Sequence, residues 1–294
     1  MSAVPASRPT PAGKRGGGGS VALSRGGRRA LTVFFVAFLI FLYVPTVLLI
    51  VFSFNRSTVA AFPLAGLTFE WYRAAFTDQA IRDALLNSLK VASACGVLST
   101  LIGVMVSFPL ARRKVWFRSG ISALLLLPLV VPTVVLGVAL LILFQRGFLQ
   151  VPLGLGAVLI AHVIIALPFT VLLIMPRIAS IDKRLEEAAY DLGASGITTF
   201  RRIILPLIIP AILSAFLIAF VVSIDEVVVA SFLTSDAVTY PIYLYSGLKF
   251  PEKTQTLIPI ATVMIVLSFG LAFAAEGLRR VGERRVGLGS KAGR

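Results

Sequence analysis

The chain is poor in the side chains from which most catalytic and metal sites are built. In 294 residues it has a single cysteine, Cys95, and a single histidine, His162. One cysteine excludes an internal disulfide framework and a cysteine-rich metal site, and one histidine removes most zinc and acid–base constellations. We expect Cys95 to be a small packing residue and His162 to be a neutral, hydrogen-bonded packing residue. The sequence predicts neither a metal nor a cofactor.

Charged residues are also scarce, and they are mostly of one sign. They make up 14% of the chain, hydrophobic residues make up 57%, and the mean hydropathy is +0.94. A soluble domain of this length needs far more polar surface, so most of the chain must face a lipid bilayer. The net charge of +15 would ordinarily suggest nucleic acid as a partner. Because the basic residues form short clusters between apolar runs, membrane topology explains them better, and we expect no nucleic acid.

Long uncharged runs predict an all-α, polytopic membrane protein with six transmembrane helices. A helix needs about 20 apolar residues to cross the hydrocarbon core. The six runs that meet this length are Ala30–Asn55, Val91–Ala111, Ser119–Phe144, Gly147–Pro176, Ile203–Ile224 and Thr254–Ala275. Prolines inside these runs, among them Pro132, predict kinks, because each removes a backbone donor.

The basic clusters predict the orientation of these helices. An even number of spans places both termini on one side. Most of the 28 basic residues lie in the two terminal segments and in residues 112–118 and 177–202. By the positive-inside rule, these segments and both termini are cytoplasmic. We predict a disordered basic tail at residues 1–29, a six-helix membrane domain at 30–280 and a second basic tail at 281–294.

A polar segment between the fourth and fifth runs carries the most specific pattern in the chain. It consists of Glu-Ala-Ala, three residues, Gly, nine residues, and Ile-x-Leu-Pro. Its defined positions are Glu187, Ala188, Ala189, Gly193, Ile203, Leu205 and Pro206. The pattern lies on the predicted cytoplasmic side.

The local sequence predicts a helix–turn–helix over this segment. Asp182 to Leu192 reads as one short helix that Asp182 can cap and Gly193 can end. Ser195 or Thr198 can cap the next helix. The alternative is an amphipathic helix that only anchors at the membrane interface.

At every defined position, the spacing resembles the EAA signature of membrane subunits of binding-protein-dependent ABC importers. The resemblance implies the type I (MetI-like) permease architecture in a bacterial inner membrane, with residues 182–206 as the segment that couples to the ATPase. It implies that Glu187 makes a charged contact with the ATPase and that Gly193 permits a tight turn at the docking surface. The implied partners are two copies of an ABC ATPase, a second permease subunit and an extracytoplasmic solute-binding protein. The second permease could be a homologue, as polyamine-type systems imply, or a second copy of this chain. The chain has no G-x-x-x-x-G-K-[ST] phosphate loop, so ATP hydrolysis would belong to the partner and the chain itself is not an enzyme.

Two adjacent acids, Asp225 and Glu226, lie in an otherwise apolar stretch. Acids within spans are costly and usually face a pore, a cavity or a partner charge. Either acid is therefore a candidate for recognising a cationic substrate, whereas contact with headgroups or with Lys249 is the alternative. The stretches 223–232 and 239–243 resemble the spermidine/putrescine permease group, which implies a polyamine substrate. Related iron, thiamine and opine permeases share the architecture and stay open as alternatives.

Two other classes of protein fit the sequence less well. An ion-gradient secondary carrier would be expected to have titratable residues in mid-span and an internal repeat, but Asp225 and Glu226 lie off-centre and no repeat is convincing. A membrane-embedded enzyme would need a catalytic constellation near the spans.

Overall fold

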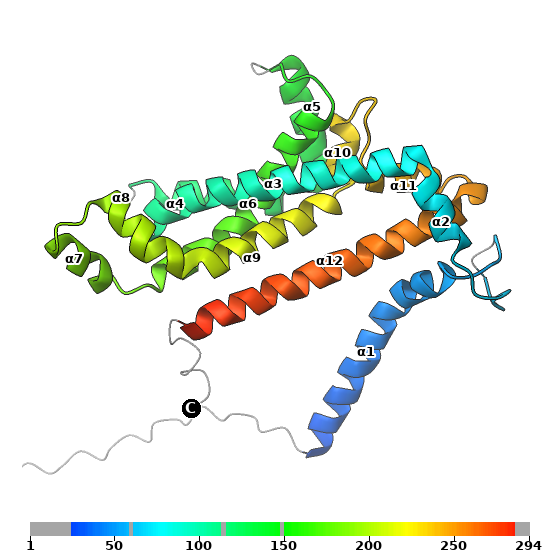
Figure 1. Ribbon diagram of the computed structural model, residues 1–294, viewed down its shortest axis with the longest axis horizontal. Coiled ribbons are helices and arrows are strands. Elements are labelled where there is room, and N and C mark those ends of the chain that lie inside the picture. Colours follow the sequence, from blue (N-terminus) through cyan, green and yellow to red (C-terminus); the bar gives the residue numbers. More distant parts are fainter. Residues whose placement is uncertain (1–24, 59–60, 113–115, 148–149, 286–294) are drawn as a thin grey trace, which may run out of the picture. The chain divides into compact units, whose positions relative to one another are not determined.

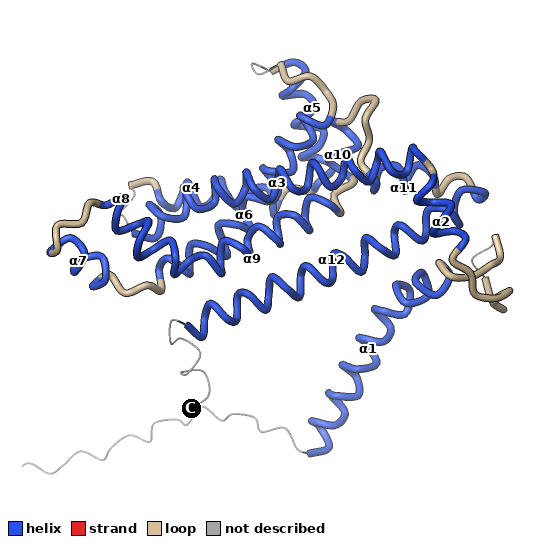
Figure 2. Tube along the Cα trace, viewed as in Figure 1, coloured by secondary structure: helices blue, strands red, loops and turns tan. Residues whose placement is uncertain are grey.

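The computed structural model describes residues 25–58, 61–112, 116–147 and 150–285. Within these ranges the regular structure is helical, and the one β-type pairing is an isolated bridge between Asn55 and Leu67 (Figure 2). The all-α prediction is confirmed. The predicted tails at 1–29 and 281–294 lie largely outside the described residues, although residues 25–29 and 281–285 belong to helices.

The chain divides into two units, Met1–Leu48 and Leu49–Arg294. Most of α1 (Arg25–Phe52) belongs to the first unit. Phe34, Phe41 and most other large side chains of α1 are exposed, and none of its most apolar window is buried. A helix that is apolar on all sides is suited to lipid or to contact with another subunit.

The second unit is built around three long helices that pack against one another: α3 (Gln79–Arg112), α6 (Leu155–Ala179) and α9 (Leu205–Ile224) (Figure 1). A fourth long helix, α12 (Pro251–Arg285), packs along α9. Small side chains such as Ala92, Ala161 and Ala215 are fully buried in this bundle, as is usual where membrane helices approach closely.

Shorter helices surround this bundle. At one end of the unit α2 (Glu70–Thr77) packs on α12 and α3, and α11 (Tyr240–Gly247) packs on the same two helices. Halfway along the chain, α4 (Arg118–Val130) packs on α6, whereas α5 (Thr133–Arg146) packs on α10 (Val228–Leu233). At the opposite end, α7 (Arg184–Asp191) and α8 (Gly196–Thr199) project from the bundle (Figure 1).

Among the described residues, five helices are long and apolar enough to span a membrane, and each overlaps one of the predicted spans. They are Gly26–Phe52, Gln79–Arg112, Leu155–Ala179, Gly196–Ile224 and Lys253–Val281. A sixth candidate is the pair α4 and α5, which passes the same test only when the two helices are taken together. The number of candidate spans reaches the predicted six only when α4 and α5 together are counted as one span.

The predicted third span, Ser119–Phe144, is not one continuous helix. The structure bends by 111° between α4 and α5. Val131 is extended, with φ −73° and ψ 130°, and so is Pro132, with φ −55° and ψ 133°. The proline ring disfavours the helical conformation at the preceding residue and removes a helical donor, so Pro132 ends α4 where the sequence predicted only a kink.

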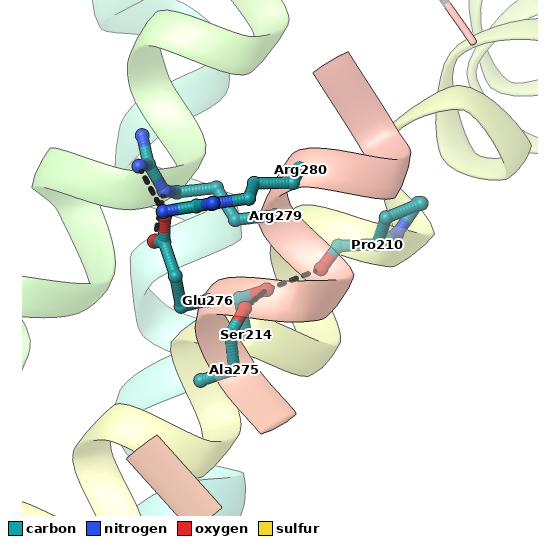
Figure 3. A network of polar contacts seen from close by, with 6 residues as sticks. All are labelled: Pro210, Ser214, Ala275, Glu276, Arg279 and Arg280. Atoms are coloured by element: carbon teal, nitrogen blue, oxygen red, sulfur yellow. Dashed lines mark hydrogen bonds and ion pairs between the residues drawn. The ribbon is translucent and has the colours of Figure 1, made fainter. Parts of the chain in front are cut away.

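Midway along α9, a buried hydroxyl joins this helix to α12. The Ser214 hydroxyl lies 2.8 Å from the carbonyl oxygens of both Pro210 and Ala275 (Figure 3). On the adjoining surface of α12, Glu276 forms ion pairs of 2.7 Å with Arg279 and Arg280. These exposed pairs stay within one helix, whereas Ser214 links two helices.

α3 and α6 approach each other closely at a glycine. A Cβ on Gly103 would lie 2.5 Å from the Thr170 hydroxyl oxygen and 2.9 Å from the Thr170 Cβ. The same hydroxyl donates to the Ser99 carbonyl at 3.0 Å, so it has little freedom to move away. Glycine is therefore needed at position 103 for the two helices to touch.

We predict that Gly103→Ala destabilises the protein by about 1–3 kcal/mol through overpacking. Gly270→Ala, inside α12, is the matched control, because a Cβ there meets nothing within 4 Å. Both changes gain the same helix propensity, so their difference isolates the packing effect. Thermal unfolding of the purified protein in detergent measures this difference, and equal midpoints would contradict the proposed close approach.

Candidate coupling segment and substrate cavity

The predicted helix of the EAA-like segment is present as α7. The Asp182 carboxylate accepts a hydrogen bond from the Arg184 backbone N–H at 3.0 Å, at the start of the helix. An acceptor in this position satisfies one of the donors that the first helical turn leaves unpaired. Asp182 therefore does what its sequence position predicted.

The turn after α7 requires glycine. Gly193 has φ +80°, in the left-handed region. The Ala194 N–H donates to the Ala189 carbonyl and the Gly193 N–H donates to the Tyr190 carbonyl, both at 2.9 Å. These two bonds are those of a Schellman motif, in which a left-handed residue closes the helix. Gly193 thus fixes the direction in which the chain leaves α7.

The second half of the pattern lies where α8 runs into α9. The Ser195 hydroxyl accepts from the Thr198 N–H at 3.3 Å and caps α8. A π-helical turn, η1 (Phe200–Ile204), then connects α8 to α9 and contains the half-buried Ile203. Leu205 is also half-buried, whereas Pro206 is exposed in the first turn of α9.

The segment presents a mixed acidic and apolar surface. Glu187 and Ala188 are exposed, whereas Ala189 is buried beneath them. Beside them, Leu192 is 89% exposed and Ile197 is 74% exposed. Exposed apolar residues that lie together can mark a protein contact, and neither residue was predicted from the sequence to make one.

One glutamate of the segment points toward the bundle. Glu186 forms an ion pair of 2.8 Å with Arg112 at the end of α3, and the two side chains are 14% and 6% exposed. Sequence reasoning placed Arg112 among the cytoplasmic charges and did not pair it with Glu186. The pairing joins two segments that are far apart in the sequence, so no local pattern reveals it.

At the other end of α9 the two adjacent acids have different surroundings. Asp225 ends α9 and accepts a hydrogen bond from the Ser268 hydroxyl of α12 at 3.2 Å. Glu226 instead accepts from the Val229 N–H at 2.8 Å and caps the start of α10. Within the described residues, neither acid pairs with Lys249.

Asp225 also lines a cavity of about 340 Å³ whose other walls are mostly apolar. Its lining includes Tyr240, Met264, Ser268 and Phe269. A single carboxylate among aromatic and aliphatic side chains is suited to a cation that carries an alkyl chain.

The lone histidine and the lone cysteine are buried inside the bundle. The His162 Nδ1 lies 2.8 Å from the Ser223 hydroxyl, so the ring is hydrogen-bonded as expected. Cys95 is fully buried. Within the described residues, no cluster of three or more potential metal ligands occurs.

Comparisons with known proteins agree with this architecture. The family described as "binding-protein-dependent transport system inner membrane component" matches residues 99–287. A spermidine/putrescine transport system permease protein, PotC, of Haemophilus influenzae is 33% identical over 243 residues, which are 82% of this chain and 92% of the relative. The PotC protein of Escherichia coli K12 is 34% identical over 84% of this chain and 92% of its own length. A putrescine permease of the same organism, PotI, is 33% identical over 71% and 76%.

Solved structures share the fold at low sequence identity. A bacterial alginate ABC transporter, solved in complex with its periplasmic protein, has a TM-score of 0.62 at 17% identity, over 88% of this chain and 94% of that one. The MetNI methionine ABC transporter has a TM-score of 0.53 at 16% identity, over 70% and 99%. With the family matched over most of its helical bundle, the chain belongs to the binding-protein-dependent transport system inner membrane components, the membrane-spanning permease subunits of ABC transporters.

Proposed function

We propose that this permease imports a polyamine such as spermidine or putrescine, and that residues 182–206 couple it to a separate ATPase. The observation that carries the coupling proposal is the capped turn at Gly193. It holds the exposed Glu187 and the apolar Leu192 and Ile197 on one rigid projection. An acidic side chain beside apolar ones provides both a charged contact and a buried contact for a partner protein.

The charge distribution supports a cytoplasmic position for this projection. Arg112, Arg177, Arg201 and Arg202 all lie at or near the end of the bundle that carries α7 and α8. Basic residues accumulate on the cytoplasmic side of membrane proteins. The coupling segment then faces the compartment that contains ATP, and both termini lie on the same side.

The position of Asp225 supports a role in substrate recognition. It lies at the opposite end of α9, and a 20-residue helix is about 30 Å long. The carboxylate and the largely apolar cavity fit a polyamine, which combines ammonium groups with alkyl chains. The names of the relatives point to the same substrate class.

The proposed machine contains more subunits than this chain. Two ATPase copies would close on the coupling segments, and a second, homologous permease would complete the pathway in the bilayer. A substrate-loaded binding protein would dock outside. The apolar surface of α1 is available for lipid or for the second permease.

A change at Gly193 should uncouple the transporter. Gly193→Val forces a β-branched residue into φ +80°, where left-handed backbone costs about 1–2 kcal/mol or more. We expect loss of uptake and of ATPase co-purification, with normal membrane insertion. Gly193→Asn is the matched control, because asparagine tolerates this conformation, and it should retain most activity. Wild-type uptake by the valine variant would refute the role of the turn.

The charged contact is tested at Glu187. Because this side chain is exposed, Glu187→Gln should leave the permease folded while it weakens co-purification of the ATPase. Losing one charge-assisted contact typically costs about 1.5–3 kcal/mol, equivalent to roughly a tenfold to hundredfold weaker complex. Unchanged ATPase binding and uptake would remove the coupling assignment.

The two adjacent acids should differ in their effect on transport. Asp225→Asn keeps an acceptor for Ser268 but removes the charge in the cavity, so we expect spermidine uptake to fall about tenfold or more. Glu226→Gln keeps an acceptor for the Val229 N–H and should be nearly silent. Uptake of labelled spermidine per copy of permease measures both, and equal losses would argue against a special role for Asp225.

A further inference from the structure

Consecutive glutamates of α7 face opposite surroundings. Residues that follow one another on a helix point about 100° apart. The Glu187 side chain is exposed, whereas the Glu186 side chain is largely buried against Arg112. The Glu186 carboxylate therefore has a partner inside this chain, whereas the Glu187 side chain faces outward.

Arg112 connects the end of α3 to the start of the projection at two points. One of its terminal nitrogens lies 2.8 Å from the Glu186 carboxylate and donates to the Ile181 carbonyl at 3.0 Å. Ile181 is itself buried in the cluster that holds α6 and α9 together, with Phe108 of α3 packed against it. The guanidinium thus lies where the projection leaves the bundle.

Beyond this contact, the attachment of α7 is slight. The helix has eight residues and packs mainly on α8, which leads through η1 into α9. The route from α7 through α8 contains the π-helical turn, and such turns often occur at hinges. A push on α7 would be absorbed there unless a second attachment fixes α7 to the bundle.

The burial of the Arg112–Glu186 pair suits it to that task. Removing one partner of a buried pair leaves a charge without compensation and strongly disturbs the site. The pairs that Glu276 makes with Arg279 and Arg280 differ, because they are exposed and lie within one helix. Exposed pairs of this kind contribute little.

We propose that Arg112 and Glu186 are positioning residues that lock α7 to α3, so that movement of the ATPase reaches the helical bundle. This inference rests on the proposed function of the coupling segment. Glu187 contacts the ATPase, whereas Glu186 transmits the movement. Loss of the pair should therefore uncouple ATP hydrolysis from transport without releasing the ATPase.

The test uses the complete transporter, with its ATPase, second permease and binding protein, in lipid vesicles with labelled spermidine as the probe. ATPase co-purification, ATP hydrolysis and uptake are measured for Glu186→Gln. We expect co-purification within twofold of wild type and uptake per ATP reduced about tenfold. Glu276→Gln, the matched control, should leave both quantities within twofold. Normal uptake per ATP in assembled Glu186→Gln complexes would overturn the proposal.

The exchange variant Arg112→Glu with Glu186→Arg separates positioning from folding. Restoring opposite charges should raise uptake per ATP at least threefold above Arg112→Glu alone, even if either single variant is less abundant in the membrane. The absence of any rescue would overturn the proposal.

Glu187→Gln distinguishes a failure of the role proposed for Glu186 from a failure of the coupling segment itself. If it weakens ATPase binding while Glu186→Gln does not, the division of roles stands. If both lower co-purification equally, Glu186 is a docking residue and the inference fails. If Glu187→Gln changes nothing, the coupling segment itself is wrongly assigned and the inference falls with it.

Discussion

The structure depends on how closely α3, α6 and α9 pack. In lipid the hydrophobic effect does not drive helices together, so small residues and interhelical hydrogen bonds must do so. At Gly103 the backbone of α3 approaches Thr170 of α6 too closely for any side chain. The His162–Ser223 contact joins α6 to α9, and Ser214 joins α9 to α12. Helices held in this way move together, which is what the proposed coupling at one end of the bundle requires.

Much of this fold follows from hydropathy and proline alone, and one span shows where that reasoning stops. The length of an uncharged run predicts a crossing because an unpaired backbone is not tolerated in hydrocarbon. Hydropathy is the same on both sides of Pro132, so the run Ser119–Phe144 reads as one helix. The break arises because Val131 and Pro132 are both extended, and α5 then packs on α10 rather than continuing along α6. That choice depends on tertiary contacts that lie far along the chain.

The candidate site also contains residues whose roles can be predicted from the sequence and residues whose roles cannot. Gly193 and Asp182 could be assigned from the sequence because their roles are local: one closes a helix and the other caps it. Glu186 could not, because its partner lies at the end of another span. The exposed Leu192 and Ile197 were open to prediction, since large apolar residues rarely occupy a polar turn without a partner.

A pair of adjacent acids lies near each end of α9. In each pair, one acid binds another part of this chain and the other faces a cavity or the outside. Glu226 caps α10 and Glu186 pairs with Arg112, so both are used to hold the chain together. Asp225 lines the cavity and Glu187 is exposed at the projection, so both are free to meet another molecule. Adjacent positions of α7 point in different directions, and Glu226 lies beyond the end of α9. An acid that fixes the backbone also fixes the direction of its neighbour. In the proposed mechanism, Glu226 and Glu186 hold the backbone in place. They thereby fix the positions of Asp225 and Glu187, which contact the substrate and the ATPase.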